Sequence, residues 1–202
     1  NNDATCKKDG TETASCKYGC GETDTRVVAN SKKAHTYTTT TTKATLKANG
    51  KIVKKCSACG TVASTTTIKY AKTFKLSTTT YTYNGKAKTP SVTVKDSAGK
   101  TLKKNVDYKV TYASGRKNVG TYKVTIKMMG KYSGTKTLTF KINPAATKVS
   151  KLSAAKKSLK VTISKKSSQV TGYQIQYSTS KTFKSKYTKT KTVSSYKTTK
   201  VT

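Results

Sequence analysis

Acidic residues are scarce in this chain of 202 residues. It has 7 aspartates and glutamates against 42 lysines and arginines, which gives a net charge of +35. Beyond residue 24 the only carboxylates are Asp96 and Asp107, and His35 is the only histidine of the chain. General acid–base catalysis needs two positioned groups with suitable pKa values. Because no such pair can be nominated, the sequence disfavours an enzyme.

Arginine, tryptophan and long apolar segments are also scarce or missing. Arg26 and Arg116 are the only arginines, and there is no tryptophan. Nucleic-acid binders use arginine forks and interleaved aromatic side chains, so nucleic acid is disfavoured as a partner. No run of 18 apolar residues exists, so we expect no transmembrane segment. The opening residues NNDATC lack the basic head and apolar stretch of a signal peptide, so a secreted protein would begin before Asn1.

Apolar residues make up 33% of the chain, below the roughly 45–50% usual for globular domains. Any hydrophobic cores are therefore expected to be thin and to belong to small modules. The excess lysine has two explanations that stay open at this point. Either it attracts a polyanion such as an anionic cell-wall polymer, or it fills outward strand positions and blocks edge-to-edge aggregation. Lys123, Lys127 and Lys141 follow the alternation of strands, which favours the second explanation.

Strict alternation of apolar and polar residues marks three segments in the middle of the chain. A period of two places alternate side chains on one face, so each segment is predicted to be a half-buried β-strand. Turn signals such as Asp96–Gly99, Ser114-Gly115 and Gly130 separate the strands, as in an antiparallel sandwich. The three segments are Tyr108/Val110/Tyr112, Tyr122/Val124/Ile126/Met128 and Leu138/Phe140/Ile142.

Residues 1–70 contain all five cysteines and an internal repeat. Residues 3–10 align with residues 43–50, and each unit then carries a cysteine pair followed by glycine, CKYGCG in the first and CSACG in the second. We expect each unit to be a strand, an Asp-Gly or Asn-Gly turn, a second strand and a cysteine knuckle. Hairpins this small bury little apolar surface, so we expect a disulfide or a metal ion to stabilise them.

Two kinds of staple fit the cysteines, and the sequence leaves both open. Close cysteines in small extracellular modules are usually disulfides. Alternatively, Cys6, Cys16, Cys20 and His35 form a Cys3His set that would hold a structural zinc ion. The second unit has Leu46 in place of Cys6 and no histidine, so Cys56 and Cys59 are the candidates for a disulfide.

The end of the chain repeats the alternation of the middle. Leu159/Val161/Ile163 and Tyr173/Ile175/Tyr177 predict two strands, after a linker at Asn143–Ala146. This last module spans too few residues for a seven-stranded sandwich of roughly 100 residues, so we expect it to be truncated and the parent chain to continue past Thr202. In the central module Asp107 is expected to cap a turn; the alternative is that it assists a Lys–Asn isopeptide bond at Asn105 or Asn118.

The central stretch resembles the immunoglobulin-like repeats of secreted and surface proteins of Gram-positive bacteria, such as Clostridia. The residues that carry the resemblance are YNGKAKTPSVTV at 83–94, DYKVTY at 107–112, VGTYKVTI at 119–126 and YSGTKTLTFKI at 132–142. GYQIQYS at 172–178 is similar to part of a fibronectin type III domain, although Ile163 stands where that family often has a core tryptophan. The front resembles the short cysteine repeats that precede such modules.

The expected fold is all-β, with tandem small modules. They are a cysteine repeat at 1–42, a second at 43–70, an Ig-like β-sandwich at 71–144 and a partial fibronectin type III-like module at 145–202. The resemblance implies a bacterial cell-surface setting and a non-enzymatic role as a stalk or adhesin segment. Two alternatives remain: a cationic module that binds the envelope or a glycan, and a subunit of a surface filament that pairs with neighbouring copies of itself.

Overall fold

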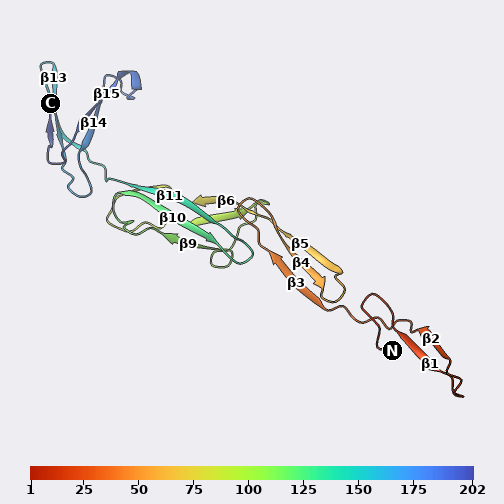
Figure 1. Ribbon diagram of the computed structural model, residues 1–202. Coiled ribbons are helices and arrows are strands. Elements are labelled where there is room, and N and C mark those ends of the chain that lie inside the picture. The colour runs from red at the N-terminus through yellow and green to blue at the C-terminus, as the bar shows by residue number, and fades with distance from the viewer. The chain divides into compact units, whose positions relative to one another are not determined.

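The computed structural model describes all 202 residues as a succession of small β-sheets (Figure 1). The predicted all-β fold of small modules is confirmed: the chain has sixteen strands, one short 3-10 helix (Ser185–Tyr187) and no α-helix. No helix in it has the length and apolar character needed to cross a membrane. The chain divides into two compact units, Asn1–Phe74 with Thr93–Lys109 and Ile126–Lys136, and Lys75–Val92 with Val110–Thr125 and Thr137–Thr202.

Two small antiparallel sheets occupy residues 1–70. The first is a hairpin of β1 (Thr11–Ser15) and β2 (Thr23–Val27). The second has three strands in the order β3 (Tyr37–Thr42), β4 (Gly50–Cys56) and β5 (Val62–Ile68). Almost every side chain of β1, β2, β3 and β5 is exposed, so neither sheet has a hydrophobic core of its own. These sheets depend on something other than apolar burial.

The internal repeat of the sequence is a repeat of the structure. In the first unit, the Thr5 hydroxyl accepts hydrogen bonds from the N–H groups of Lys7 and Lys8. In the second unit, the Thr45 hydroxyl accepts the equivalent bonds from residues 47 and 48. In each unit the observed order is turn, strand, cysteine knuckle and strand. The predicted order of strand, turn, strand and knuckle is therefore wrong. Gly10 immediately precedes β1 and Gly50 is the first residue of β4. A Cβ at Gly50 would lie only 2.3 Å from the carbonyl oxygen of residue 42.

The turn of the second unit packs against a later part of the chain. Leu46 stands at the position that Cys6 has in the first unit, and its Cγ would lie 2.9 Å from a Cβ at Gly134. Close by, Ala44 is completely buried, and its N–H donates to the carbonyl of Lys131. The turn that opens this unit therefore contacts a segment that follows the unit in sequence.

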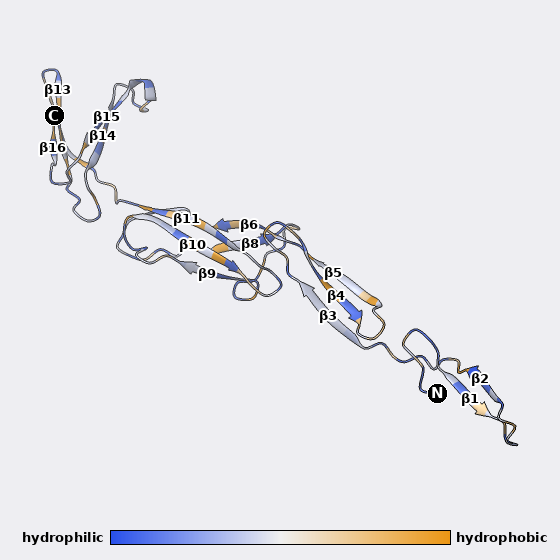
Figure 2. Cartoon of the chain, viewed as in Figure 1, coloured by the Kyte–Doolittle hydropathy of each residue, from blue (hydrophilic) through white to orange (hydrophobic).

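The middle of the chain contains a four-stranded sheet and a two-stranded sheet. The alternating segments predicted from sequence are present as the strands β9 (Tyr108–Tyr112), β10 (Gly120–Met128) and β11 (Thr135–Asn143), which are neighbours in the larger sheet, so this prediction is confirmed. Figure 2 shows the blue and orange alternation along β10 and β11. The larger sheet has the order β7 (Thr80–Thr82), β11 (Thr135–Asn143), β10 (Gly120–Met128) and β9 (Tyr108–Tyr112), and the smaller one pairs β6 (Ala71–Leu76) with β8 (Val92–Asp96).

A small aromatic core lies within the second compact unit. Phe140 is 1% exposed and packs with the buried Leu76, Val124 and Ile142. The rings of Tyr81 and Tyr122 lie 5.7 and 5.6 Å from the Phe140 ring. Aromatic rings at such distances contribute beyond their buried area, so this cluster stabilises the central sheets.

Residues 145–202 form two further sheets, of three and two strands. Val161, Ile163, Tyr173 and Val193 are buried between them. The Tyr173 hydroxyl donates to the carbonyl of Tyr196 at 2.9 Å. The predicted strands at 159–163 and 173–177 are present as β13 and β14. The sheets are β12 (Val149–Ala155), β13 (Ser158–Ile163) and β16 (Lys200–Val201), and β14 (Tyr173–Ser178) with β15 (Thr188–Val193).

Candidate metal centre

A cysteine knuckle connects β4 to β5. The Cys56 N–H donates to the carbonyl of Thr61, and the Gly60 N–H donates back to the carbonyl of Cys56 at 3.0 Å. Gly60 has a φ of 76°, a left-handed conformation that glycine adopts without strain. The tight turn places Cys56 and Cys59 on the same side of the loop, with Cys56 only 1% exposed.

The other two residues of the site come from the first repeat and the segment that follows it. Cys6 lies in the Thr5 turn. The Lys33 N–H donates to the carbonyl of Thr5 at 3.0 Å, and the Lys32 N–H donates to the Asp9 carboxylate at 3.1 Å. These bonds hold the segment that leads to His35 beside the turn that carries Cys6. Cys6 and His35 both lie outside the strands, so these loop contacts position them.

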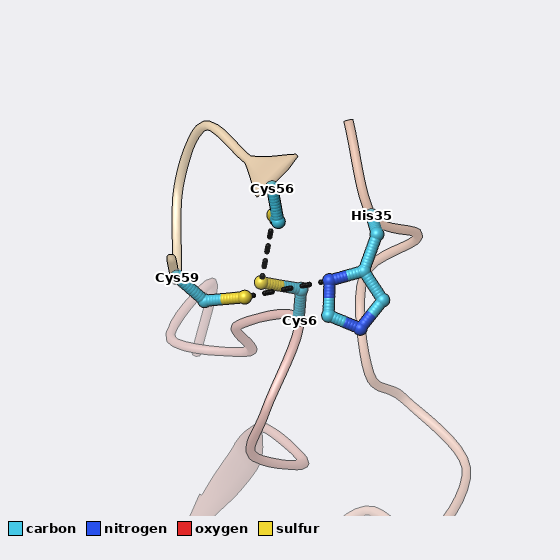
Figure 3. Close-up of side chains that lie close together, drawn as sticks. All are labelled: Cys6, His35, Cys56 and Cys59. Carbon is cyan, nitrogen blue, oxygen red and sulfur yellow. Dashed lines mark hydrogen bonds between the residues drawn. The ribbon is translucent and has the colours of Figure 1, made fainter. Parts of the chain in front are cut away.

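Together the four side chains form a compact cluster, shown in Figure 3. The ligand atoms of Cys6, His35, Cys56 and Cys59 all lie within 4.8 Å of one another. Cys6 Sγ is 3.8 Å from Cys56 Sγ, and Cys59 Sγ is 3.4 Å from His35 Nδ1. In a tetrahedral zinc site with Zn–S bonds of about 2.3 Å, two sulfurs lie about 3.8 Å apart and a sulfur and a nitrogen about 3.6 Å apart. These four residues could bind a metal ion.

Local hydrogen bonds give the three thiols different proton affinities. The Cys59 backbone N–H is the main cause that lowers the pKa of Cys56 to about 7. The Thr61 hydroxyl, 3.2 Å from Cys59 Sγ, lowers the pKa of Cys59. The hydrogen bond with Cys59 raises the pKa of Cys6 to about 11. The thiolate is the form of cysteine that ligates a metal, so the lowered pKa values of Cys56 and Cys59 favour a cation, and Cys6 would release its proton if one bound.

The His35 ring is oriented by an aromatic neighbour. It stacks on Tyr37 with the ring centroids 5.6 Å apart, and Lys54 Nζ lies 5.0 Å from the Tyr37 centroid on the adjacent strand. Outer groups that fix a histidine ring are typical of metal sites. Tyr37, the first residue of β3, therefore connects the site to the three-stranded sheet.

The predicted zinc set needs correction in two of its four members. Cys6 and His35 do meet, but Cys16 and Cys20 form a disulfide, with their Cα atoms 5.9 Å apart. Cys56 and Cys59, expected as a disulfide, are free thiols in the cluster. The physical reason is that the turn of each repeat packs on a part of the chain that follows that repeat. The turn of the first unit faces the knuckle of the next, just as Leu46 of the second unit faces Gly134. The signal that could have found this was the C-x2-C-G spacing of Cys56 and Cys59, a stronger zinc signature than C-x3-C.

The two acidic residues beyond residue 24 both serve turns. The Asp107 carboxylate accepts the Lys103 N–H at 2.7 Å, which is the expected turn cap. Asp96, 7% exposed, accepts the N–H groups of Ala98 and Lys100. Both carboxylates are thus engaged with backbone.

Comparison with protein-family models, curated proteins and solved structures found no match. The chemistry of the Cys3His cluster therefore rests on its geometry alone.

Proposed function

We propose that this chain is a non-enzymatic segment of a bacterial cell-surface protein, a stalk or adhesin segment, whose N-terminal sheets are held together by a structural zinc ion. The observation that carries the proposal is the Cys3His cluster. It joins two repeats across 50 residues of sequence, in a part of the chain whose sheets have no core. The surface location follows from the resemblance to bacterial Ig-like repeats and is part of the proposal.

Zinc suits this cluster better than other common cations. Three thiolates and one imidazole are soft and borderline ligands, which exclude magnesium and calcium and favour tetrahedral zinc. All four positions are filled by protein atoms, which is typical of a structural site and leaves no open position for a substrate. Cys56 is buried and the other three residues are partly buried. The expected role is therefore to supply folding free energy that the apolar residues do not.

Metal analysis tests the zinc site directly. Purified chain is expected to contain one zinc per molecule, and cobalt substitution should give the spectrum of a tetrahedral thiolate site. Cys56→Ser should abolish stoichiometric binding. Cys16→Ser is the matched control, because it removes a cysteine that lies outside the cluster and should retain the metal. Zinc-free protein whose cluster cysteines are found in disulfides would contradict the zinc proposal.

The rest of the chain supports the stalk role. Residues 71–202 form small sheets built mainly of strands near one another in sequence, and the only histidine belongs to the metal cluster. Asp96 and Asp107, which are the remaining acid–base candidates, are used by turns. A series of small β-modules of this kind suits a spacer that separates other domains from a surface.

Binding to the envelope is the second candidate function, and the unpaired lysines favour it. Only one ion pair forms in the chain, between Arg26 and Glu12. The compact unit made of Lys75–Val92, Val110–Thr125 and Thr137–Thr202 contains no aspartate or glutamate. Lysines without carboxylate partners attract a polyanion and release its counterions. Anionic cell-wall polymers or glycans have the chemistry that this unit would bind.

A salt series separates the two functions. The chain would be mixed with purified Gram-positive cell walls at 20, 150 and 500 mM NaCl, beside an unrelated protein of equal charge. A stalk is expected to bind no better than that control at 150 mM, where charges more than roughly 8 Å apart are screened. Retention above the control at 150 mM would favour the envelope-binding function over the stalk.

A further inference from the structure

Strand β3 is an unprotected sheet edge. It pairs with β4 on one side only, and all six of its residues, Tyr37 to Thr42, are exposed. Five of them are consecutive threonines, which strongly favour extended chain. Exposed edges present unpaired N–H and C=O groups, which proteins usually protect with charges, prolines or bulges. β3 has none of these protections.

The lysines of the three-stranded sheet lie on its central strand, where they do not protect the β3 edge from pairing with another strand. Lysines occupy most strands of the chain, and only β3, β5 and β14 combine five or more residues with no charge. The β5 ladder contains a bulge near Lys54, and β14 buries Tyr173. In the three-stranded sheet all the lysines of the strands belong to β4 in the centre (Figure 2). β3 is therefore the one long strand that is neutral, regular and exposed throughout.

From this arrangement we infer that β3 is a self-association edge, which pairs antiparallel with β3 of a second copy of the chain. This interaction does not depend on the proposed stalk role, and it is tested on zinc-loaded chain because β3 belongs to a sheet that the proposed zinc ion would stabilise. The threonines need no complementary charge on the other strand, so β3 is complementary to itself. Cross-strand threonine pairs are favourable in antiparallel sheets.

The net charge of the chain does not prevent this pairing. If β3 meets β3, the two β4 strands lie three strand spacings apart, about 14 Å. That distance exceeds the screening length of about 8 Å at physiological salt. Lys43 directly follows β3, and antiparallel pairing centred on Thr39 would place the two copies of Lys43 at opposite ends, eight residues or about 27 Å apart. The neutral strand thus keeps the backbones of the two lysine-bearing strands apart. Lys54, whose Nζ lies 5.0 Å from the Tyr37 ring centroid, reaches over β3, so its charge is one that salt must screen.

The register of β3 with β4 shows which backbone groups are available. Tyr37 lies opposite Cys56, and the Ser57 N–H donates to the carbonyl of Thr36. Antiparallel hydrogen bonding alternates, so residues 38, 40 and 42 direct their backbone groups to β4. Residues 37, 39 and 41 direct theirs to the free edge. In a symmetric pair Thr39 would lie at the centre, opposite Thr39 of the second copy.

Two substitutions at Thr39 would break this pairing without removing a bond between β3 and β4. Thr39→Pro deletes the N–H that faces the free edge, and it does so in both copies. Thr39→Lys places two ammonium groups close together at the centre of the pair. The matched control is Thr121→Lys, which adds the same charge to β10, an interior strand paired on both sides.

Sedimentation velocity of the full chain from about 10 to 500 µM tests the inference, because a six-residue edge buries less area than the roughly 1,000 Å² of a stable interface. We expect a reversible dimer at the upper concentrations that strengthens between 50 and 500 mM NaCl as the lysines are screened. Thr39→Pro should weaken it about tenfold or more, Thr39→Lys should weaken it most at low salt, and Thr121→Lys should leave it unchanged.

Three results would overturn the inference. The first is a monomer at all concentrations in 500 mM NaCl. The second is dimerisation that the two Thr39 variants retain. The third is dimerisation that Thr121→Lys weakens as much as Thr39→Lys, since the effect would then be one of total charge. Circular dichroism identifies any loss of folding in Thr39→Pro, and in that case Thr39→Lys decides the outcome alone.

Discussion

Removal of one ligand of the cluster should unfold the sheets of residues 1–70 and leave the later sheets intact. We choose Cys6→Ser, because Cys6 is the ligand that connects the first repeat to the second. In the proposed zinc site the metal would close a chain segment of 50 residues between Cys6 and Cys56. In the chain-entropy model such a cross-link contributes about 4 kcal/mol. In the sheets it connects, Cys56 and Ile68 are the only buried side chains, so apolar burial within them compensates for little of its loss.

The Cys16–Cys20 disulfide provides the internal comparison. It closes a segment with a sequence separation of only 4, for which the same model gives about 2 kcal/mol. Cys16→Ser should therefore cost about half as much. Its effect should also stay within β1 and β2, the two strands that the disulfide joins at their turn.

Amide hydrogen exchange read by mass spectrometry or NMR resolves both the size and the place of the effect. For zinc-loaded protein, about 4 kcal/mol corresponds to exchange of the β4 amides that is roughly a thousandfold faster in Cys6→Ser. Cys16→Ser should leave these amides unchanged, and β10 should be unaffected in both variants. A chelator should reproduce the Cys6→Ser pattern in the unmodified chain. Equal protection of β4 in Cys6→Ser and in the unmodified chain would refute the cross-link argument.

Three further predictions concern proton release, the aromatic core and the close approach at Gly50. Zinc affinity should rise with pH, because the thiols lose their protons when they bind the metal. The slope of affinity against pH should decrease above pH 7, where Cys56 with a pKa of about 7 is already ionised. Calorimetry in buffers of different ionisation enthalpy counts the released protons, and a pH-independent affinity would contradict thiolate ligation. Phe140→Ala should destabilise the central sheets by about 3–5 kcal/mol, since Phe140 is buried between Tyr81 and Tyr122. Thermal denaturation measures the loss of stability, and a loss below about 1 kcal/mol would mean that the aromatic cluster is not the core of these sheets. Gly50→Ala should disturb the start of β4 and weaken zinc binding, because the new Cβ would lie 2.3 Å from a backbone oxygen. Ala48→Gly in the adjacent turn is the control for backbone flexibility. Unchanged zinc affinity in Gly50→Ala would show that the turn and the metal site are uncoupled.

The strands of the middle and the end of the chain could be predicted from sequence because their signal is local. Val124, Phe140 and Ile142 alternate with lysine and threonine, and a period of two specifies a strand wherever one face is buried. The same period is absent from the Thr39–Thr42 tract, where both faces are exposed. There only the β-branched residues favour extended chain, and the tract forms the larger part of β3.

The ligand set could not be predicted in full because it depends on which repeat each turn faces. Spacing along the sequence grouped Cys6 with Cys16 and Cys20, its neighbours in the same unit. In the folded chain the turn of one unit approaches the knuckle of the next, so Cys6 meets Cys56 and Cys59. The repeat could be recognised from sequence, but the packing of one unit on the next is a tertiary property. His35 was found correctly because there was no other histidine to choose.

With the proposed zinc ion bound, the position of the cluster would give the chain a mechanical property. Tension applied at the two ends would enter at Cys6, cross the metal and leave through the knuckle at Cys56 and Cys59, so it would bypass the segment between them. That segment, of about 50 residues, could extend by up to about 170 Å once the cluster ruptured. The β1–β2 hairpin and β3 lie within it and would carry no load before that event. A stalk built in this way would respond to a strong pull with one large extension, at a force set by zinc–sulfur bonds.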